Sequence, residues 1–353
     1  MKVLITGASG QIGTNVGLAL LERGDTVHGI DNRANTWTDR IETTLLNLSR
    51  CAPTDLPDKT KYDVVLHLAA YAKVFELVEH PERAMENMTM LFNALEYCRR
   101  TKTPIIFGSS REVYGDIHRW ITVEHEADFV VAESPYSATK IGSEALIYSY
   151  GECYGLPHLV FRFSNVYGRY DCDAQRMERV IPLFIQRIAN DQPITVYGKD
   201  KTLDFTYVDD CVQGVVKGID ALVGGKITEA TVNLACGQGA SLLDLVNMIG
   251  MCLGRTPQAT FEPSRPGEVT RYVADISIAR ELLGYEPTTP LSGGLPKAIA
   301  WQREVGLLRS EHFAPPCTLV EPASLPSAGH LIASEMYDTP ANRAGKPAAP
   351  ASG

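Results

Sequence analysis

The chain has 353 residues, of which 44% are hydrophobic and 21% are charged, as in an ordinary soluble globular protein large enough for two subdomains. Its formal net charge of −9 argues against general binding to nucleic acids or anionic membranes. We see no signal-peptide pattern and no apolar run near the ~20 residues that span a bilayer. The eight cysteines and eight histidines show no metal-binding spacing. We therefore expect a cytoplasmic protein with reduced thiols and no metal site.

The first half of the chain alternates short apolar strands with helical segments. Strands are expected at 2–6, 26–30, 63–69, 104–109 and 158–163, and helices after the first strand, over 81–100 and over about 135–154. Such alternation predicts an α/β fold with a parallel, doubly wound sheet. The pattern loosens after residue 165, where we expect a helix near 177–190, two short strands, a helix from Asp209 and a strand at 230–235 that returns to the sheet.

These patterns divide the chain into two domains and a tail. One domain covers 1–165 together with about 204–236, and a smaller α/β domain covers 166–203 and 237–304. Seven of the 21 prolines lie after residue 308. We therefore expect the Pro/Ala-rich tail, 305–353, to be partly disordered.

A glycine-rich turn follows the first predicted strand, with Gly7, Gly10 and Gly13 in a G-x-x-G-x-x-G spacing. Glycines let the backbone approach a pyrophosphate, and the helix that follows offers unpaired N–H groups and a positive dipole end. Asp31 ends the second strand, where its carboxylate would hold the adenosine ribose and repel a 2'-phosphate. This favours NAD over NADP as the cofactor, although Arg33 is a residue type that accommodates such a phosphate.

Further motifs follow in order: "TDL" at 54–56, "HLAA" at 67–70, "SSREVYG" at 109–115, "YSATK" at 136–140, "RFSNVYG" at 162–168, "VDD" at 208–210 and "RPGE" at 265–268. With them the chain resembles, over about 1–305, the extended short-chain dehydrogenase/reductase family in its NAD-dependent nucleotide-sugar epimerase/dehydratase branch. The resemblance implies a Rossmann-type NAD-binding domain and a smaller C-terminal domain that binds a nucleotide sugar. It also implies a homodimer formed through the helices at 81–100 and 135–154.

The same resemblance implies the binding residues. The expected cofactor contacts are Gly7, Gly10, Gln11, Ile12, Gly13, Asp31, Asn32, Asp55, Leu56, Leu68, Ala69, Ala70, Lys73, Tyr136, Lys140 and Phe163. The expected substrate contacts are Lys73, Ser110, Arg111, Glu112, Tyr136, Asn165, Arg187, Val196, Tyr197 and Arg265. Asn165 and Arg265 would contact the diphosphate of the nucleotide, which is expected to be UDP.

Two Tyr-x-x-x-Lys spacings compete for the catalytic role. Tyr136 and Lys140 lie on a predicted helix and face one way, whereas Tyr197 and Lys201 lie in a predicted loop. We assign the first pair to catalysis. The Lys140 ammonium and the nicotinamide ring are expected to lower the pKa of Tyr136 from its usual value of about 10, so that the phenolate takes the proton of a sugar hydroxyl. Ser110 would donate to the developing carbonyl oxygen.

The residues after Ser110 leave three reactions open. Glu112 matches a glutamate of the family's 4,6-dehydratases and fits UDP-glucuronate decarboxylases. With Ser110, Tyr136 and Lys140 it is therefore a catalytic candidate. Arg111, however, stands where the dehydratases have an aspartic acid, and a guanidinium is no general acid at neutral pH. A 4-epimerase needs only Ser110, Tyr136, Lys140 and room for the 4-keto sugar to turn over.

The main prediction is therefore an NAD-dependent 4-epimerase of a UDP-hexose or UDP-glucuronic acid. Arg111 would either pair with a C6 carboxylate or point to solvent or to Glu112; Lys73, Arg169 and Arg187 are other candidates for that carboxylate. Leu203 stands where the family usually has an arginine, so nucleotides other than UDP stay open. A non-catalytic NAD-sensing protein is the alternative from a different functional class.

Overall fold

The computed structural model describes residues 1–57, 61–115, 124, 132–171, 179–265 and 267–308. The chain divides into two units, Met1–Glu321 and Pro322–Gly353. All described residues belong to the first unit. Most of the predicted tail, from 309 on, lies outside the described residues.

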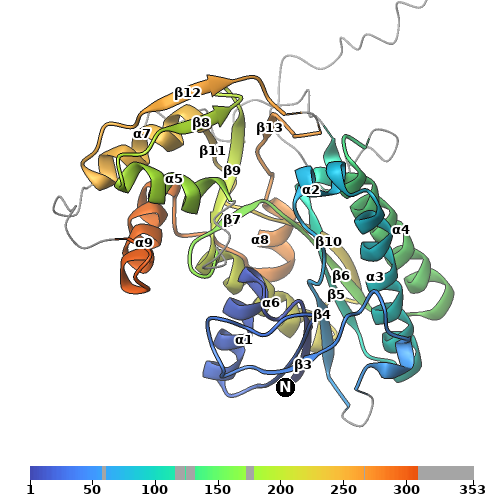
Figure 1. Ribbon diagram of the computed structural model, residues 1–353. Helices are drawn as coiled ribbons and strands as arrows, with labels where there is room; N and C mark the ends of the chain where they lie inside the picture. Colours follow the sequence, from blue (N-terminus) through green and yellow to red (C-terminus); the bar gives the residue numbers. More distant parts are fainter. Residues whose placement is uncertain (58–60, 116–123, 125–131, 172–178, 266, 309–353) are drawn as a thin grey trace, which may run out of the picture. The chain divides into compact units, whose positions relative to one another are not determined.

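Seven parallel strands form the central sheet, in the order β10-β6-β5-β4-β1-β2-β3 (Figure 1). Their bounds are β1 (Lys2–Thr6), β2 (Thr26–Asp31), β3 (Glu42–Leu45), β4 (Val64–His67), β5 (Ile105–Ser110), β6 (His158–Phe163) and β10 (Glu229–Leu234). The strand order reverses between β1 and β4, and in such sheets ligands bind at this switch point, beyond the carboxyl ends of the strands. The predicted doubly wound parallel sheet is confirmed.

Helices cover both faces of this sheet. Figure 1 shows α3 (Glu82–Thr101) and α4 (Pro135–Tyr154) on one face, and α1 (Gln11–Arg23) and α6 (Val208–Val223) on the other. Successive residues of a strand point to opposite faces. Accordingly Leu4 packs in a core cluster with residues of α3 and α4, whereas its neighbours Val3 and Ile5 belong to the cluster on the α1 side.

Two smaller sheets build a second lobe. In one sheet β9 (Thr202–Tyr207) pairs with β7 (Asn165–Tyr167), β11 (Gly239–Ser241) and β13 (Arg271–Tyr272); in the other, β8 (Ile194–Tyr197) pairs with β12 (Ala259–Glu262). The remaining helices are α2 (Val74–Glu79), α5 (Val180–Ala189), α7 (Leu242–Leu253), α8 (Ser277–Leu283) and α9 (Leu291–Glu304), with short 3-10 turns at η1 (Pro53–Asp55) and η2 (Arg111–Tyr114). None of the helices in the described part of the chain combines the length and apolarity that crossing a membrane requires.

Candidate active site

The glycine turn between β1 and α1 is shaped for a close ligand. Gly7 has φ +75°, and a Cβ there would lie 2.7 Å from the backbone nitrogen of Ala69 at the end of β4. A Cβ on Gly13 would lie 2.3 Å from the carbonyl oxygen of Gly7. The helix α1 begins at Gln11 without a side-chain cap and without an acidic residue in its first turn. This cradle fits the pyrophosphate of a dinucleotide.

A cavity of about 330 Å³ adjoins the turn at the end of β2. The Asp31 carboxylate is held there by the backbone N–H groups of Ser9, at 2.9 Å, and Arg33, at 3.2 Å. The cavity lining brings together these predicted cofactor residues: Gly7, Gly10, Asp31, Asn32, Leu68, Ala69 and Ala70. This geometry suits the adenosine half of a dinucleotide.

Asp55 and Leu56 do not line this cavity. The Asp55 carboxylate accepts a hydrogen bond from the backbone of Ala52 and closes η1, and Leu56 is buried in the core. Asn47 and Leu48, just after β3, line the cavity instead. These two residues were not predicted, because β3 is a short, mostly exposed strand without an apolar run in the sequence.

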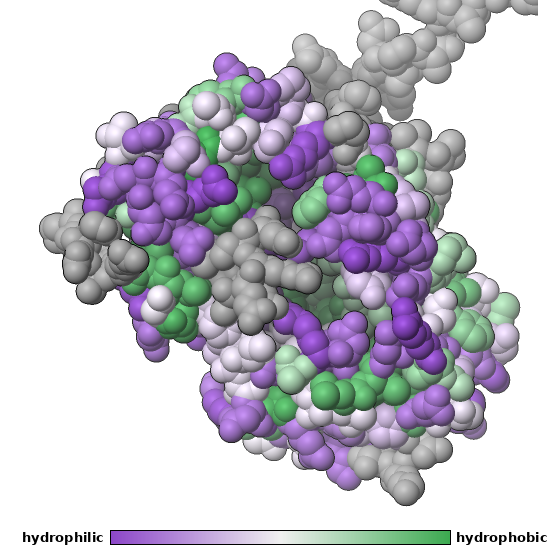
Figure 2. Space-filling view, viewed as in Figure 1, coloured by the Kyte–Doolittle hydropathy of each residue, from purple (hydrophilic) through white to green (hydrophobic). Residues whose placement is uncertain are grey.

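The main cleft has a volume of about 690 Å³ and joins the carboxyl ends of the central strands to the second lobe. Figure 2 shows this face hollowed, with hydrophilic residues along much of the rim. The predicted residues in its lining are Gly7, Gly10, Gln11, Ile12, Gly13, Leu68, Ala70, Lys73, Ser110, Arg111, Glu112, Tyr136, Lys140, Phe163, Asn165, Arg187, Tyr197 and Arg265. The structure therefore brings most of the predicted cofactor and substrate residues into one cleft.

Val196 is the exception among the predicted substrate contacts. Its side chain is fully buried in the core, whereas its neighbours Thr195 and Tyr197 line the cleft. Alternation along β8 turns one residue inward and the next outward. On β8 the cleft is therefore lined by Thr195 and Tyr197, with Ile194 before them, and not by the Val196 side chain.

The predicted catalytic residues meet at the end of β5. Ser134 caps α4 by accepting a hydrogen bond from the backbone of Ser137, so Tyr136 and Lys140 stand one turn apart on the same helix face. Ser110 lies close enough to the Tyr136 hydroxyl for its side chain to lower the pKa of that hydroxyl. The Lys140 Nζ donates to the carbonyl oxygen of Gly108 at 2.6 Å and lies 5.8 Å from the centroid of the Tyr136 ring.

Burial sets the acidity of this group. It raises the pKa of Tyr136 to about 12, and the Ser110 side chain only partly offsets the rise. Burial also lowers the pKa of Lys140 to about 8, against the attraction of Glu144. The sequence predicted a pKa of Tyr136 lowered by the Lys140 ammonium and the nicotinamide ring together. Among the protein's own groups desolvation outweighs the other effects, and the Lys140 ammonium is directed at a backbone carbonyl. The positive nicotinamide ring would oppose this rise, so the lowered pKa in the presence of the cofactor stays a prediction.

Arg111 and Glu112 pair with each other beside Ser110. The Nη2 atom of Arg111 lies 3.0 Å from Oε1 of Glu112, and their side chains are only 13% and 5% exposed. The other polar tips, Nη1 of Arg111 and Oε2 of Glu112, are buried without a hydrogen-bond partner in the described residues. Burial raises the pKa of Glu112, although Arg111 opposes the rise. Both side chains line the cleft and keep binding capacity for a ligand.

The second Tyr-x-x-x-Lys spacing has a different geometry. Tyr197 ends β8, and its ring stacks under the guanidinium of Arg265 at 4.0 Å from the ring centroid. Lys201 forms an ion pair with Glu268. These two residues share no helix and do not reproduce the arrangement of Tyr136 and Lys140.

Three other predicted contact residues form interactions within the protein. Lys73 pairs with Glu76 at 3.0 Å, and Arg187 donates to the carbonyl oxygen of Pro193 at 3.1 Å. Asn165 donates to the carbonyl oxygen of Asp204. No cluster of three or more His, Cys, Asp or Glu side chains within the described residues is arranged to hold a metal ion.

The fold and the glycine turn define a dinucleotide-binding α/β protein. Residues 3–235 match the model of the NAD dependent epimerase/dehydratase family, and the chain belongs to this family. This confirms the family predicted from the sequence, its Rossmann-type fold and its cofactor, NAD.

The relatives are named as epimerases of UDP-sugars. A Bacillus subtilis protein named as an uncharacterized UDP-glucose epimerase, YtcB, is 32% identical over 85% of this chain and 98% of its own length. UDP-glucuronate 4-epimerase 1 of Arabidopsis thaliana is 33% identical over 85% of this chain and 76% of its own. The structure of UDP-glucuronic acid 4-epimerase from Bacillus cereus, in complex with UDP-glucuronic acid and NAD, matches with a TM-score of 0.78 and 29% identity, over 86% of this chain and all of the other. These relatives agree with the main functional prediction, a 4-epimerase.

Proposed function

We propose that the protein is an NAD-dependent 4-epimerase of a UDP-linked sugar and that its preferred substrate is a uronic acid. The observation that carries the proposal is the meeting of Ser110, Tyr136 and Lys140 at the carboxyl end of β5, in the cleft that also contains the glycine turn. The names of the relatives support the same activity.

The residues of the cleft have distinct roles in the proposed reaction. The glycine turn and Asp31 would hold NAD, which would supply the hydride acceptor and donor for C4 of the sugar and so be regenerated. Tyr136 takes the proton of the 4-hydroxyl and gives it back to the same oxygen after the sugar has turned over. Ser110 donates a hydrogen bond to that oxygen, and Lys140 holds the nicotinamide ribose.

Epimerisation requires the 4-keto sugar to rotate while the nucleotide stays bound, so that the hydride returns to the opposite face of the sugar. The cleft in which this would take place has a volume of about 690 Å³, within the range for ligand sites. Arg265 and Asn165 are the proposed contacts of the UDP diphosphate, opposite the glycine turn.

Arg111 supports a uronic acid as the sugar. Its Nη1 is a buried donor with no hydrogen-bond partner among the described residues, and a C6 carboxylate would satisfy it with a charge-assisted hydrogen bond. A neutral hydroxymethyl group would pair less strongly. Arg111, a permanent cation, stands where a dehydratase needs an acid. It would also stabilise the C6 carboxylate, which a decarboxylase must convert to CO₂.

The test is to incubate the purified protein with UDP-glucuronate and with UDP-glucose separately and to weigh the products. We expect a new chromatographic peak of unchanged mass, formed faster from the uronate. Loss of water would mean a dehydratase, and loss of CO₂ would mean a decarboxylase. Replacement of Arg111 with Ala should lower kcat/KM for the uronate about tenfold to a hundredfold more than for the hexose. An equal loss on both sugars would contradict the role of Arg111. Arg280→Ala, which removes an exposed cation outside the cleft, is the matched control.

We also propose that the protein is a cytoplasmic homodimer formed through α3 and α4. Met85 and Phe92 on α3 are 69% and 46% exposed, which is a large fraction for apolar side chains. The scattered cysteines of the sequence suit a reducing compartment.

A further inference from the structure

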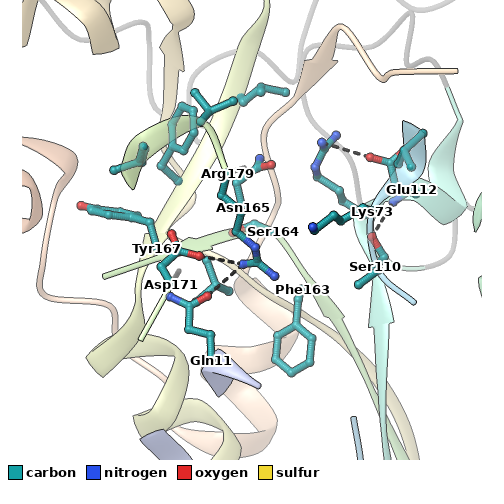
Figure 3. A pocket seen from close by; sticks show the side chains of 18 of the residues that line it. Gln11, Lys73, Ser110, Glu112, Phe163, Ser164, Asn165, Tyr167, Asp171 and Arg179 are labelled. Atoms are coloured by element: carbon teal, nitrogen blue, oxygen red, sulfur yellow. Dashed lines mark hydrogen bonds and ion pairs between the residues drawn. The ribbon is translucent and has the colours of Figure 1, made fainter. Parts of the chain in front are cut away.

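Arg179 lines the cleft but has no part in the reaction described above. It immediately precedes α5, and its side chain is 47% exposed. One nitrogen, Nη1, donates both to Oε1 of Gln11 at 2.9 Å and to Oδ1 of Asp171 at 2.9 Å (Figure 3). Gln11 is the first residue of α1. A cation from the edge of the second lobe therefore reaches the glycine turn.

The turn already attracts anions without this cation. The first turn of α1 has no acidic side chain and no side-chain cap, so its backbone N–H groups and its positive dipole end face the cleft. Gln11 is only 8% exposed, and its Nε2 atom is buried without a hydrogen-bond partner in the described residues. An unpaired buried donor and a guanidinium thus converge on one end of a helix. This donor set suits the oxygens of a diphosphate.

Asp171 holds the guanidinium in this place. Its side chain is 3% exposed and lies against Arg179. The residue before it, Tyr170, has φ +59° and packs its ring against Trp37 and Trp301, at centroid distances of 5.8 and 5.6 Å. Asn15 of α1 donates to the carbonyl oxygen of Arg169 at 3.1 Å. Contacts with Asn15 of α1 and with Trp37 in the loop after β2 therefore hold the segment 169–171 in place.

We propose that Arg179 binds the diphosphate of NAD from the second-lobe side of the cleft and that Asp171 is its positioning residue. The inference rests on the NAD requirement of the family and not on the choice of sugar. The cofactor must stay in place while the sugar rotates, because the same NAD returns the hydride. A guanidinium that bridges the glycine turn and the second lobe would slow the dissociation of NAD.

The alternative source of a diphosphate is the nucleotide sugar. Arg265, the proposed contact of that group, stacks on Tyr197 of β8, whereas Arg179 contacts the first residue of α1. The cofactor is therefore the ligand that the geometry favours for Arg179.

The test measures binding of NAD and of UDP separately, by calorimetry, without any sugar. Arg179→Met keeps the bulk of the side chain and removes the charge. We expect the NAD affinity to fall about tenfold to a hundredfold, with less NAD retained per chain after purification, and the UDP affinity to change less than twofold. Arg187→Met, which removes another cation of the same cleft, should leave the NAD affinity within twofold.

Two further variants separate positioning from folding. Arg179→Lys keeps the charge and should recover part of the NAD affinity. Asp171→Asn should weaken NAD binding severalfold in the natural chain but have no further effect in the Arg179→Met chain, because its role acts through Arg179. Loss of UDP affinity with unchanged NAD affinity would assign Arg179 to the nucleotide sugar and overturn the proposal. Unchanged affinity for both ligands would overturn it as well. Since no turnover is measured, failure here is distinct from failure of the epimerase assay.

Discussion

Lys140 is a buried ammonium with little to compensate its lost hydration. Its Nζ donates to the carbonyl oxygen of Gly108 and lies 4.6 Å from the centroid of the Phe107 ring. Burial lowers its pKa to about 8, although Glu144 acts in the other direction. A charged group in such a site lowers the stability of the fold at neutral pH, and perturbed groups of this kind gather at functional sites.

We expect Lys140→Met to abolish turnover and yet to stabilise the NAD-free protein. At pH 7 the lysine is charged in both states, and its charge is less favourable in the folded one. The variant should gain on the order of 2 kcal/mol in the free energy of unfolding. Between the folded pKa of about 8 and the unfolded value of 10.5 the folded state has released the proton that the unfolded state still holds. In this range the free energy of unfolding of the wild type therefore rises relative to that of the variant. The difference between the two free energies should be smaller at pH 10 than at pH 7.

The measurement is urea unfolding of both chains at pH 7 and pH 10, with the exposed Lys61→Met as the control. A gap that is the same at both pH values would contradict a lowered pKa for Lys140.

The sequence located the candidate catalytic residues more readily than the residues around them. Ser110, Tyr136 and Lys140 belong to local motifs, and strand and helix geometry brings those motifs together. Arg179 and Asp171 belong to no such motif, because their contact with Gln11 depends on how the second lobe folds back. Whether Arg111 pairs with Glu112 was likewise left open by the sequence, since neighbouring residues can point apart.

At the scale of elements, the carboxylate of Asp204 in β9 is hydrogen-bonded to two other segments of the chain. Asp204 is fully buried and accepts hydrogen bonds from the backbone N–H groups of Cys236 and Gly237, each at 2.9 Å, and of Ala274 at 3.3 Å. These donors lie after β10 and after β13. The aspartate beside Leu203 in "KTLDF" thus has a structural role that its motif did not reveal.

Replacement of Asp204 with Asn should destabilise the fold without changing the chemistry. The amide has one oxygen in place of two and turns an NH₂ group toward backbone donors, so at least one N–H loses its acceptor. We expect the free energy of unfolding to fall by about 2 kcal/mol, measured by urea unfolding. Asp39→Asn, at an exposed position, should change it by less than about 0.5 kcal/mol. A stable Asp204→Asn protein would mean that these backbone groups find other partners.

Two of the strands that were not predicted, β3 and β12, share a physical reason. β3 is an edge strand of the central sheet, and three of its four residues are exposed. β12 has the same pattern in the small sheet with β8. Short exposed strands show no apolar alternation, whereas the buried β1, β5 and β6 read directly as apolar runs.

At the scale of the whole described chain, the two lobes share a core. One cluster of buried side chains includes Val3 and Leu66 of the central sheet together with Phe184, Val196 and Leu245 of the second lobe. The dinucleotide cleft lies where these parts meet. A ligand in that cleft therefore stabilises both lobes, and the protein should unfold in one transition.

Removal and return of NAD tests this coupling. We expect NAD added to the stripped protein at about 1,000 times its Kd to raise the free energy of unfolding by about 4 kcal/mol and to shift the whole melting curve upward. NADP should shift the curve much less, because Asp31 is held by two backbone N–H groups where a 2'-phosphate would lie. Asp31→Ala should narrow the difference between the two cofactors. Two separate transitions, of which NAD shifts only one, would show that the shared core does not couple the lobes. Equal shifts with NAD and NADP would instead show that Arg33 outweighs Asp31 at the ribose.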